Sequence, residues 1–156
     1  MPDTTRRGAL AQGLIVVGVD GSDASREALR WAVAEARLRS ARLRVVHAWW
    51  AYPMGGAADP PITERVGGDA QSAVEAFVTE TVRGEDVDVE VVAVQGRQAS
   101  AALSDAAKGA DLLVVGSRGA GGFTGLLLGS VSQQCTYHAP SPVVIVRRRG
   151  SDMQQP

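Results

Sequence analysis

A glycine-rich stretch near the C-terminus carries the residues best suited to hold an anion. It begins at Gly116 and ends at Gly129 and Ser130, where a short helix is expected to start. Glycine lets the backbone turn sharply and approach a ligand, and the free amides of a helix N-terminus suit phosphate. Further donors are offered by Arg118 and by the hydroxyls of Ser117, Thr124 and Ser130. Composition alone leaves two interpretations open, a phosphate-binding loop or a flexible surface loop with a serine N-cap.

The segments that must position this stretch include five apolar runs that predict β-strands. They are nearly continuous or alternate with polar residues, and they are rich in β-branched side chains. Their ranges are 14–19, 43–48, 87–93, 112–115 and 143–146. The glycine-rich stretch therefore follows the end of the fourth predicted strand, and this edge of a parallel sheet is where ligands bind.

Helical spacing of apolar residues separates these strands. The first predicted helix follows a cap at Ser22 or Asp23, the second begins at Ala70, and the third covers 99–106. Strict alternation of strands and helices implies a parallel sheet between two layers of helices, because each parallel connection needs a crossover. Prolines and glycines fill 49–68, which predicts a lid or a connector without long regular structure.

The composition is that of one ordinary globular domain. Of the 156 residues, 45% are hydrophobic and 21% are charged, and the formal net charge is −1. These values argue against disorder and against nucleic-acid binding by bulk charge. The apolar run 14–19 is too short for a signal sequence or a membrane helix, so we expect a cytoplasmic protein that binds no membrane. Cys135 is the sole cysteine and is expected to be a buried apolar residue.

Three enzyme classes lack the residues that they require. A P-loop needs Gly-Lys followed by Ser or Thr, whereas Lys108, the only lysine, is followed by Gly109. A nicotinamide site needs Gly-x-Gly-x-x-Gly after the first strand, where 18–21 reads Gly-Val-Asp-Gly. A hydrolase needs an organised base or a metal cluster, and His47 has no such partner in sequence, so it is predicted to be a hydrogen-bonded structural histidine. We expect no catalytic residues and, if ATP is cleaved at all, slow hydrolysis.

The spacing within the glycine-rich stretch is more specific than its composition. Gly116, Gly119, Gly129 and Ser130 match the pattern Gly-x2-Gly-x9-Gly-Ser, which resembles the nucleotide loop of the universal stress protein family. The resemblance extends from Ile15 to Arg147 and implies that family's α/β fold. That fold is a three-layer sandwich with a five-stranded parallel sheet in the order 3-2-1-4-5, described as adenine nucleotide alpha hydrolase-like. The expected organisation is a tail over 1–12, a universal stress protein domain over 13–148 and a tail over 149–156.

The resemblance also assigns roles to residues outside the loop. It places Asp20 beside the nucleotide, near the ribose or as a ligand of a phosphate-bound Mg²⁺ or Mn²⁺. The alternative for Asp20 is a turn or capping residue before the first helix. The backbone of Ala48 would recognise the adenine edge, and Val131 would place a further amide near the phosphates. The expected nucleotide-binding residues are Asp20, Ala48, Gly116, Arg118, Gly119, Gly129, Ser130 and Val131.

The implied function is that of a regulatory ATP-binding protein of the stress response. The alternatives are a cyclic AMP sensor and an interaction module that needs no nucleotide. A homodimer through the fifth strand, 143–146, is expected because an uncovered apolar edge strand invites pairing and because the family pairs in this way.

Overall fold

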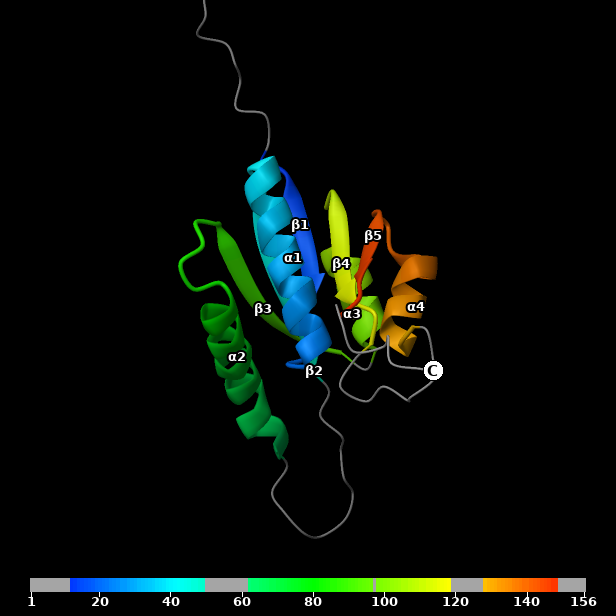
Figure 1. Ribbon diagram of the computed structural model, residues 1–156. Coiled ribbons are helices and arrows are strands. Elements are labelled where there is room, and N and C mark those ends of the chain that lie inside the picture. The colour runs from blue at the N-terminus through cyan, green and yellow to red at the C-terminus, as the bar shows by residue number, and fades with distance from the viewer. Residues whose placement is uncertain (1–11, 50–61, 97, 119–127, 149–156) are drawn as a thin grey trace, which may run out of the picture.

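The computed structural model describes residues 12–49, 62–96, 98–118 and 128–148, and over 62–68 it describes the backbone only. The described strands form one five-stranded sheet in the order β3-β2-β1-β4-β5, and all neighbouring strands are parallel (Figure 1). The prediction of a parallel α/β sheet in the order 3-2-1-4-5 is confirmed. The elements are β1 (Leu14–Gly18), α1 (Asp23–Arg39), β2 (Arg42–Trp49), α2 (Ile62–Thr81), β3 (Val89–Gln95), α3 (Ala99–Ala106), β4 (Leu112–Gly116), α4 (Ser130–His138) and β5 (Val143–Val146).

Several predicted boundaries are wrong. Helix α2 begins at Ile62, so the expected irregular segment 49–68 includes about two turns of helix, and β2 extends to Trp49. The glycines at 67 and 68 cost about 1 kcal/mol each relative to alanine but do not break a helix, and the segment's prolines all precede Ile62. Residues 50–61 lie outside the described part of the chain. Strand β3 occupies Val89–Gln95 instead of 87–93.

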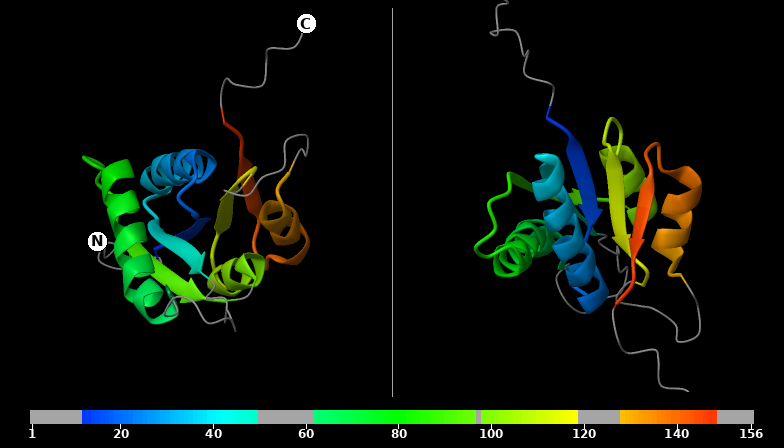
Figure 2. Two further views of the ribbon diagram at one scale, coloured as in Figure 1. Left: turned by 90° about the horizontal axis from the view of Figure 1, so that it is seen from below. Right: turned by 45° about the horizontal axis from the view of Figure 1, so that its top comes forward.

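The sheet is covered by helices on both faces, as the three-layer prediction requires. Figure 2 shows α1 and α2 on one face and α3 and α4 on the other. The alternation of side chains along β1 supplies both cores, because Ile15 and Val17 pack with α1 whereas Val16 packs with α3 and α4. Cys135 of α4 is fully buried, as predicted, and burial raises the pKa of its thiol to about 11. None of the helices in the described ranges could span a membrane.

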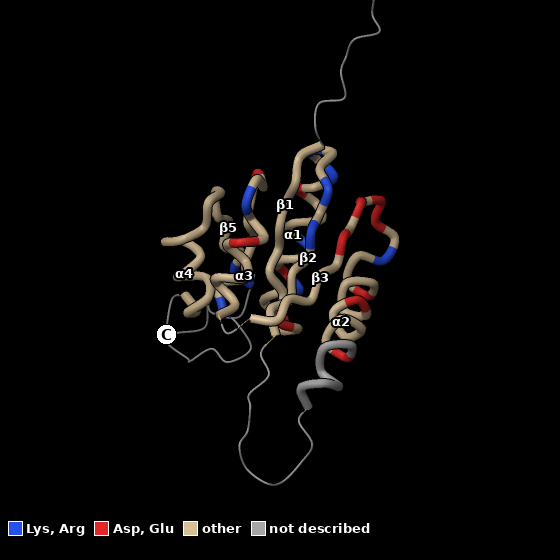
Figure 3. The backbone as a smooth tube through the Cα atoms, turned by 180° about the vertical axis from the view of Figure 1, so that it is seen from behind, with Lys and Arg blue, Asp and Glu red and all other residues tan. Residues whose placement is uncertain are grey.

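Opposite charges join α1 to α2 and to the turn after it on one face of the sheet, and join β2 to β3 on the other face. The arginines of α1 and β2 lie opposite acidic residues of α2, β3 and the turn between them (Figure 3). The nitrogen–oxygen distances of the pairs between these elements are 2.6 Å for Arg37–Glu85, 2.7 Å for Arg44–Glu90 and 3.5 Å for Arg26–Glu80. Each pair is exposed on at least one side and adds little by itself, so the apolar contacts hold α2 on the sheet.

One side chain of α2 binds the middle of the outer edge of β3. The Gln71 amide nitrogen donates to the Val91 carbonyl oxygen at 3.1 Å, and the Gln71 amide oxygen accepts from the Ala93 N–H at 2.8 Å. These two backbone groups point away from β2, because the even-numbered residues Asp88 and Gly96 make the bonds to β2. Gln71 therefore takes the place that the peptide group of a sixth strand would occupy.

Candidate functional site

The turn between β1 and α1 is held by a compact set of hydrogen bonds. The Asp20 carboxylate accepts from the Ser22 N–H at 2.9 Å, and the Ser22 hydroxyl oxygen accepts from the Ser25 N–H at 3.2 Å. The buried Ser25 hydroxyl donates to the Ser22 carbonyl at 2.9 Å and accepts from the Asp20 N–H at 3.3 Å. Ser22 is therefore the N-cap of α1, and Gly21 supplies the positive φ of +84°. Asp20 is a turn residue, as its alternative interpretation required, and its nucleotide role stays a prediction.

At the end of β4, Gly116 is needed for packing. A Cβ atom at Gly116 would lie 3.0 Å from the backbone oxygen of Ala24 and 3.1 Å from its carbonyl carbon. The first turn of α1 can approach β4 this closely only because residue 116 has no side chain. The missing Cβ thus makes room for α1, whereas the sequence suggested that it makes room for a ligand.

The two ends of the glycine-rich stretch meet. The Gly129 N–H donates to the Ser117 carbonyl oxygen at 2.7 Å, and the Ser132 hydroxyl lies 3.2 Å from the same oxygen and 2.9 Å from the Gly129 carbonyl oxygen. Ser132 is buried and was missed by the sequence analysis, because a serine in the first turn of a helix has many other uses. Residues 119–127, including Gly119 and Thr124, lie outside the described ranges.

Helix α4 begins with an N-terminus that no side chain caps. Its N-cap is Gly129, in extended conformation, and no side-chain cap hydrogen bond is present there. The serine N-cap of the alternative interpretation is therefore wrong, and Gly129 and Ser130 open the helix as predicted. The first-turn amides, including those of Ser130 and Val131, have no acceptor within the helix, and the helix dipole adds positive potential beside them. This end of α4 can stabilise an anion.

Ala48 directs its backbone polar groups toward the space beyond β1. In β2 the even-numbered residues face β1, as shown by the bonds from Arg42 N–H to Gly13 O and from Val19 N–H to Val46 O. Strand β1 ends at Gly18, so the Ala48 N–H and C=O point past its end. A backbone donor and acceptor side by side match the edge of a base that carries both groups.

These features lie at one edge of the sheet. The turn at Asp20, the end of β2 at Ala48, Gly116 and the start of α4 all lie at the carboxyl ends of the central strands, where Figure 1 also shows the first turns of α1 and α4. Strands β1 and β4 are neighbours there, and their connections leave in opposite directions. Such a switch point is where parallel α/β sheets bind ligands.

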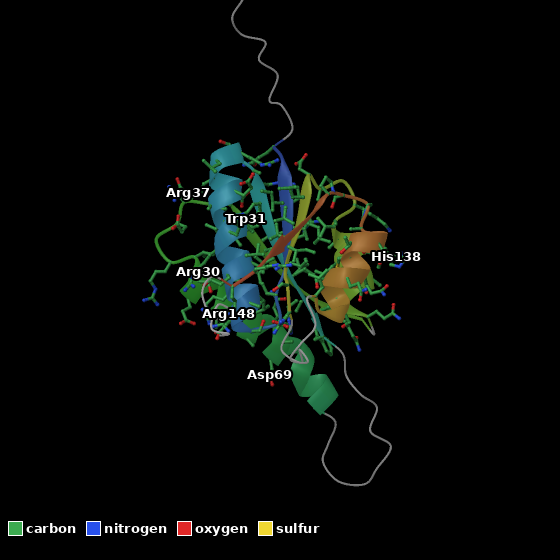
Figure 4. The ribbon with its side chains drawn as sticks, turned by 45° about the vertical axis from the view of Figure 1, so that its right-hand side comes forward. Arg30, Trp31, Arg37, Asp69, His138 and Arg148 are labelled. Atoms are coloured by element: carbon green, nitrogen blue, oxygen red, sulfur yellow. The ribbon has the colours of Figure 1, made fainter. Side chains whose placement is uncertain are left out.

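The charged side chains near this edge are few. Arg118 is partly buried at the start of the glycine-rich stretch. Arg148 lies beside the first turn of α1 (Figure 4), with a guanidinium nitrogen 3.9 Å from a carboxylate oxygen of Asp23. Across the described ranges, no three His, Cys, Asp or Glu side chains are grouped so that they could hold a metal ion. A metal ion at Asp20 would therefore need ligands from a bound molecule.

The fold and this edge define a doubly wound α/β protein with the layout of a nucleotide-binding domain. The model of the universal stress protein family matches residues 13–147, and the chain belongs to that family. A universal stress protein of Thermus aquaticus is 38% identical over 137 residues, which cover 85% of this chain and 97% of that protein. One of Mycobacterium tuberculosis is 37% identical over 142 residues, which cover 86% of this chain and 45% of the relative. The chain thus spans about half the length of several curated relatives it matches.

Solved structures agree with this assignment. A universal stress protein of Lactobacillus plantarum has a TM-score of 0.69 at 23% identity, covering 86% of this chain and 97% of that one, which shows the shared fold. A universal stress protein in complex with cAMP is 28% identical with a TM-score of 0.61, covering 87% of this chain and 97% of that one. One from Archaeoglobus fulgidus in complex with dAMP is 26% identical with a TM-score of 0.59, covering 85% and 96%. These two relatives bind adenine nucleotides.

Proposed function

We propose that the protein binds ATP at the carboxyl edge of the sheet and acts as a regulatory binder in the stress response. The observation that carries the proposal is the uncapped N-terminus of α4, joined through Gly129 to the end of β4. Its amides and dipole suit the phosphates, and the spacing of Gly116, Gly119, Gly129 and Ser130 matches a nucleotide loop. Arg118 and the amide of Val131 are further proposed phosphate contacts.

The backbone of Ala48 supports a preference for adenine over guanine. Its N–H can donate to a ring nitrogen of adenine while its carbonyl oxygen accepts from the exocyclic amino group. Guanine presents an N–H and a carbonyl oxygen at the corresponding positions, which reverses the pattern. Because the contact uses the main chain, it does not depend on the identity of the side chain at position 48.

Asp20 fits the way in which Mg²⁺ and Mn²⁺ accompany nucleotides in proteins. Such ions are commonly held by one or two carboxylates together with the phosphates and water. The Ser22 N–H fixes one Asp20 oxygen in the turn, which orients the carboxylate. The metal would neutralise phosphate charge, and we expect any hydrolysis of ATP to be slow.

Cyclic AMP is the closest alternative ligand, because a relative 28% identical to this chain is solved in complex with cAMP. A cyclic monophosphate would need the adenine contact and fewer phosphate donors. The third possible function is that of an interaction module that needs no nucleotide.

We also propose that the chain forms a homodimer through β5. Strand β5 is at a sheet edge, has the sequence VVIV and pairs only with β4 among the described strands. At the opposite edge Gln71 already binds two outward-facing backbone groups in the middle of β3, so β5 offers the more accessible backbone for pairing. Light scattering at micromolar concentration should give twice the mass of the chain, and a monomer would contradict the proposal. A cytoplasmic location is expected for this function.

The deciding experiment is identification of bound nucleotide by mass after denaturation of the purified protein, followed by thermal shifts with ATP, ADP, cyclic AMP and GTP. At 100 times its dissociation constant a ligand adds about 2.7 kcal/mol of stability, which for a domain of this size raises Tm by roughly 5–11 °C. ATP should stabilise more than GTP at equal concentration. A preference for cyclic AMP over ATP would favour the sensor, and no shift with any nucleotide would favour the interaction module.

A further inference from the structure

The imidazole of His47 makes a hydrogen bond that changes the end of the β1–β2 ladder. His47 Nδ1 lies 2.9 Å from the carbonyl oxygen of Val19, the residue just before Asp20. A carbonyl oxygen only accepts, so Nδ1 carries the proton in this contact. The prediction that His47 is a hydrogen-bonded structural histidine is thereby confirmed.

The Val19 carbonyl is the acceptor that a longer parallel ladder would use for Ala48. Val19 N–H donates to Val46 O at 2.9 Å, and the next bond of a regular ladder would run from the Ala48 N–H to Val19 O. That bond is not among the hydrogen bonds of the described residues, where His47 takes the Val19 oxygen. The side chain of one β2 residue thus replaces the backbone N–H of the next.

From this geometry we propose that His47 is a positioning residue for adenine recognition, because it keeps the Ala48 N–H out of the ladder and available to the base. The inference rests on the proposed nucleotide function and adds a residue to its account of how the base is recognised. His47 would touch neither the base nor the phosphates and would act through Val19 and Ala48. Without the imidazole, the Val19 carbonyl would need another donor, and the Ala48 N–H is the nearest ladder partner.

Three variants separate the hydrogen bond from simple packing. His47→Asn keeps a side-chain N–H near the position of Nδ1, His47→Gln moves the donor one bond further out, and His47→Leu removes it at similar bulk. We expect His47→Leu and His47→Gln to raise the Kd for ATP by roughly 3- to 10-fold, the effect of one net hydrogen bond. His47→Asn should restore most of the affinity.

Inorganic tripolyphosphate is the control ligand, because it has no base. Its affinity should stay within about twofold of wild type in every folded variant. Circular dichroism and Tm identify any variant that fails to fold, and the Asn and Gln variants keep the comparison available if Leu is not tolerated. Equal weakening of ATP and tripolyphosphate would overturn the proposal, as would wild-type ATP affinity in folded His47→Leu or His47→Gln.

Amide hydrogen exchange of the nucleotide-free protein supplies a readout that needs no ligand. The Ala48 amide should exchange rapidly in wild type and in His47→Asn, and at least tenfold more slowly in His47→Leu, where it can join the ladder. Unchanged exchange at Ala48 in His47→Leu would overturn the inference. If wild type bound neither ATP nor tripolyphosphate, the proposed function would be wrong, and the exchange rates alone would decide whether His47 keeps the Ala48 amide out of the ladder.

Discussion

Replacing Gly116 by alanine should destabilise the fold, because the new Cβ would meet backbone rather than a movable side chain. It would lie 3.0 Å from the Ala24 oxygen, 3.1 Å from its carbonyl carbon and 3.3 Å from its Cβ. These atoms belong to the first turn of α1 and can move only if that turn moves. Overpacking of this kind costs typically 1–3 kcal/mol. For a domain of this size the loss lowers Tm by about 2–4 °C per kcal/mol.

Gly18→Ala is the matched control in the neighbouring strand. Its Cβ would come within 2.8 Å and 2.9 Å of the two terminal methyl carbons of Leu103. Those methyl groups end a flexible side chain, so rotation of Leu103 can relieve much of the contact. Urea unfolding followed by circular dichroism should therefore show a larger drop in midpoint for Gly116→Ala than for Gly18→Ala. Equal midpoints for wild type and Gly116→Ala would refute the view that Gly116 is required by the approach of α1.

Three further predictions concern the loop, the turn and the sheet edge. Gly119→Val should abolish ATP binding in isothermal titration while circular dichroism stays native, and Ser130→Ala should weaken binding less, by the roughly 1.5–3 kcal/mol of one charged hydrogen bond; a folded Gly119→Val that binds like wild type would remove the loop from the phosphate site. Asp20→Ala should lower ATP affinity mainly when Mg²⁺ is present, and an equal loss in EDTA would argue against a metal role. Gln71→Ala should cost about 1–3 kcal/mol in urea unfolding, because two backbone hydrogen bonds of β3 are lost; an unchanged midpoint would mean that water replaces the side chain without cost.

Most of the fold is predictable from hydrophobic patterns, because buried positions recur with the period of a strand or of a helix. Alternation in 87–93 gave the correct faces of β3 but placed the strand two residues early, since pairing with β2 fixes its ends and begins at Leu43 and Val89. The start of α2 was placed late because glycine and proline were given equal weight as helix breakers. In a helix interior, proline is about 2 kcal/mol less favourable than glycine.

The site was predictable where it depends on local spacing and unpredictable where it depends on distant partners. The opening of α4 at Gly129 and Ser130 follows from the order of residues. The contact of His47 with Val19 spans 28 residues, and that of Gln71 with Ala93 spans 22. No local sequence pattern predicts such hydrogen bonds. They arise when the sheet order brings the segments together, and they decide which backbone groups remain available.

The two hydrogen bonds of Gln71 to β3 bear on how copies of this chain would assemble. A parallel sheet with two available edges can add strands at both ends, and repeated addition gives an open-ended polymer. In the proposed dimer, pairing through β5 would use the same edge of both partners, and Gln71 would hinder a third chain from adding at the middle of β3. A single amide side chain would thus disfavour continued edge-to-edge addition in a chain that has an apolar strand at its other edge.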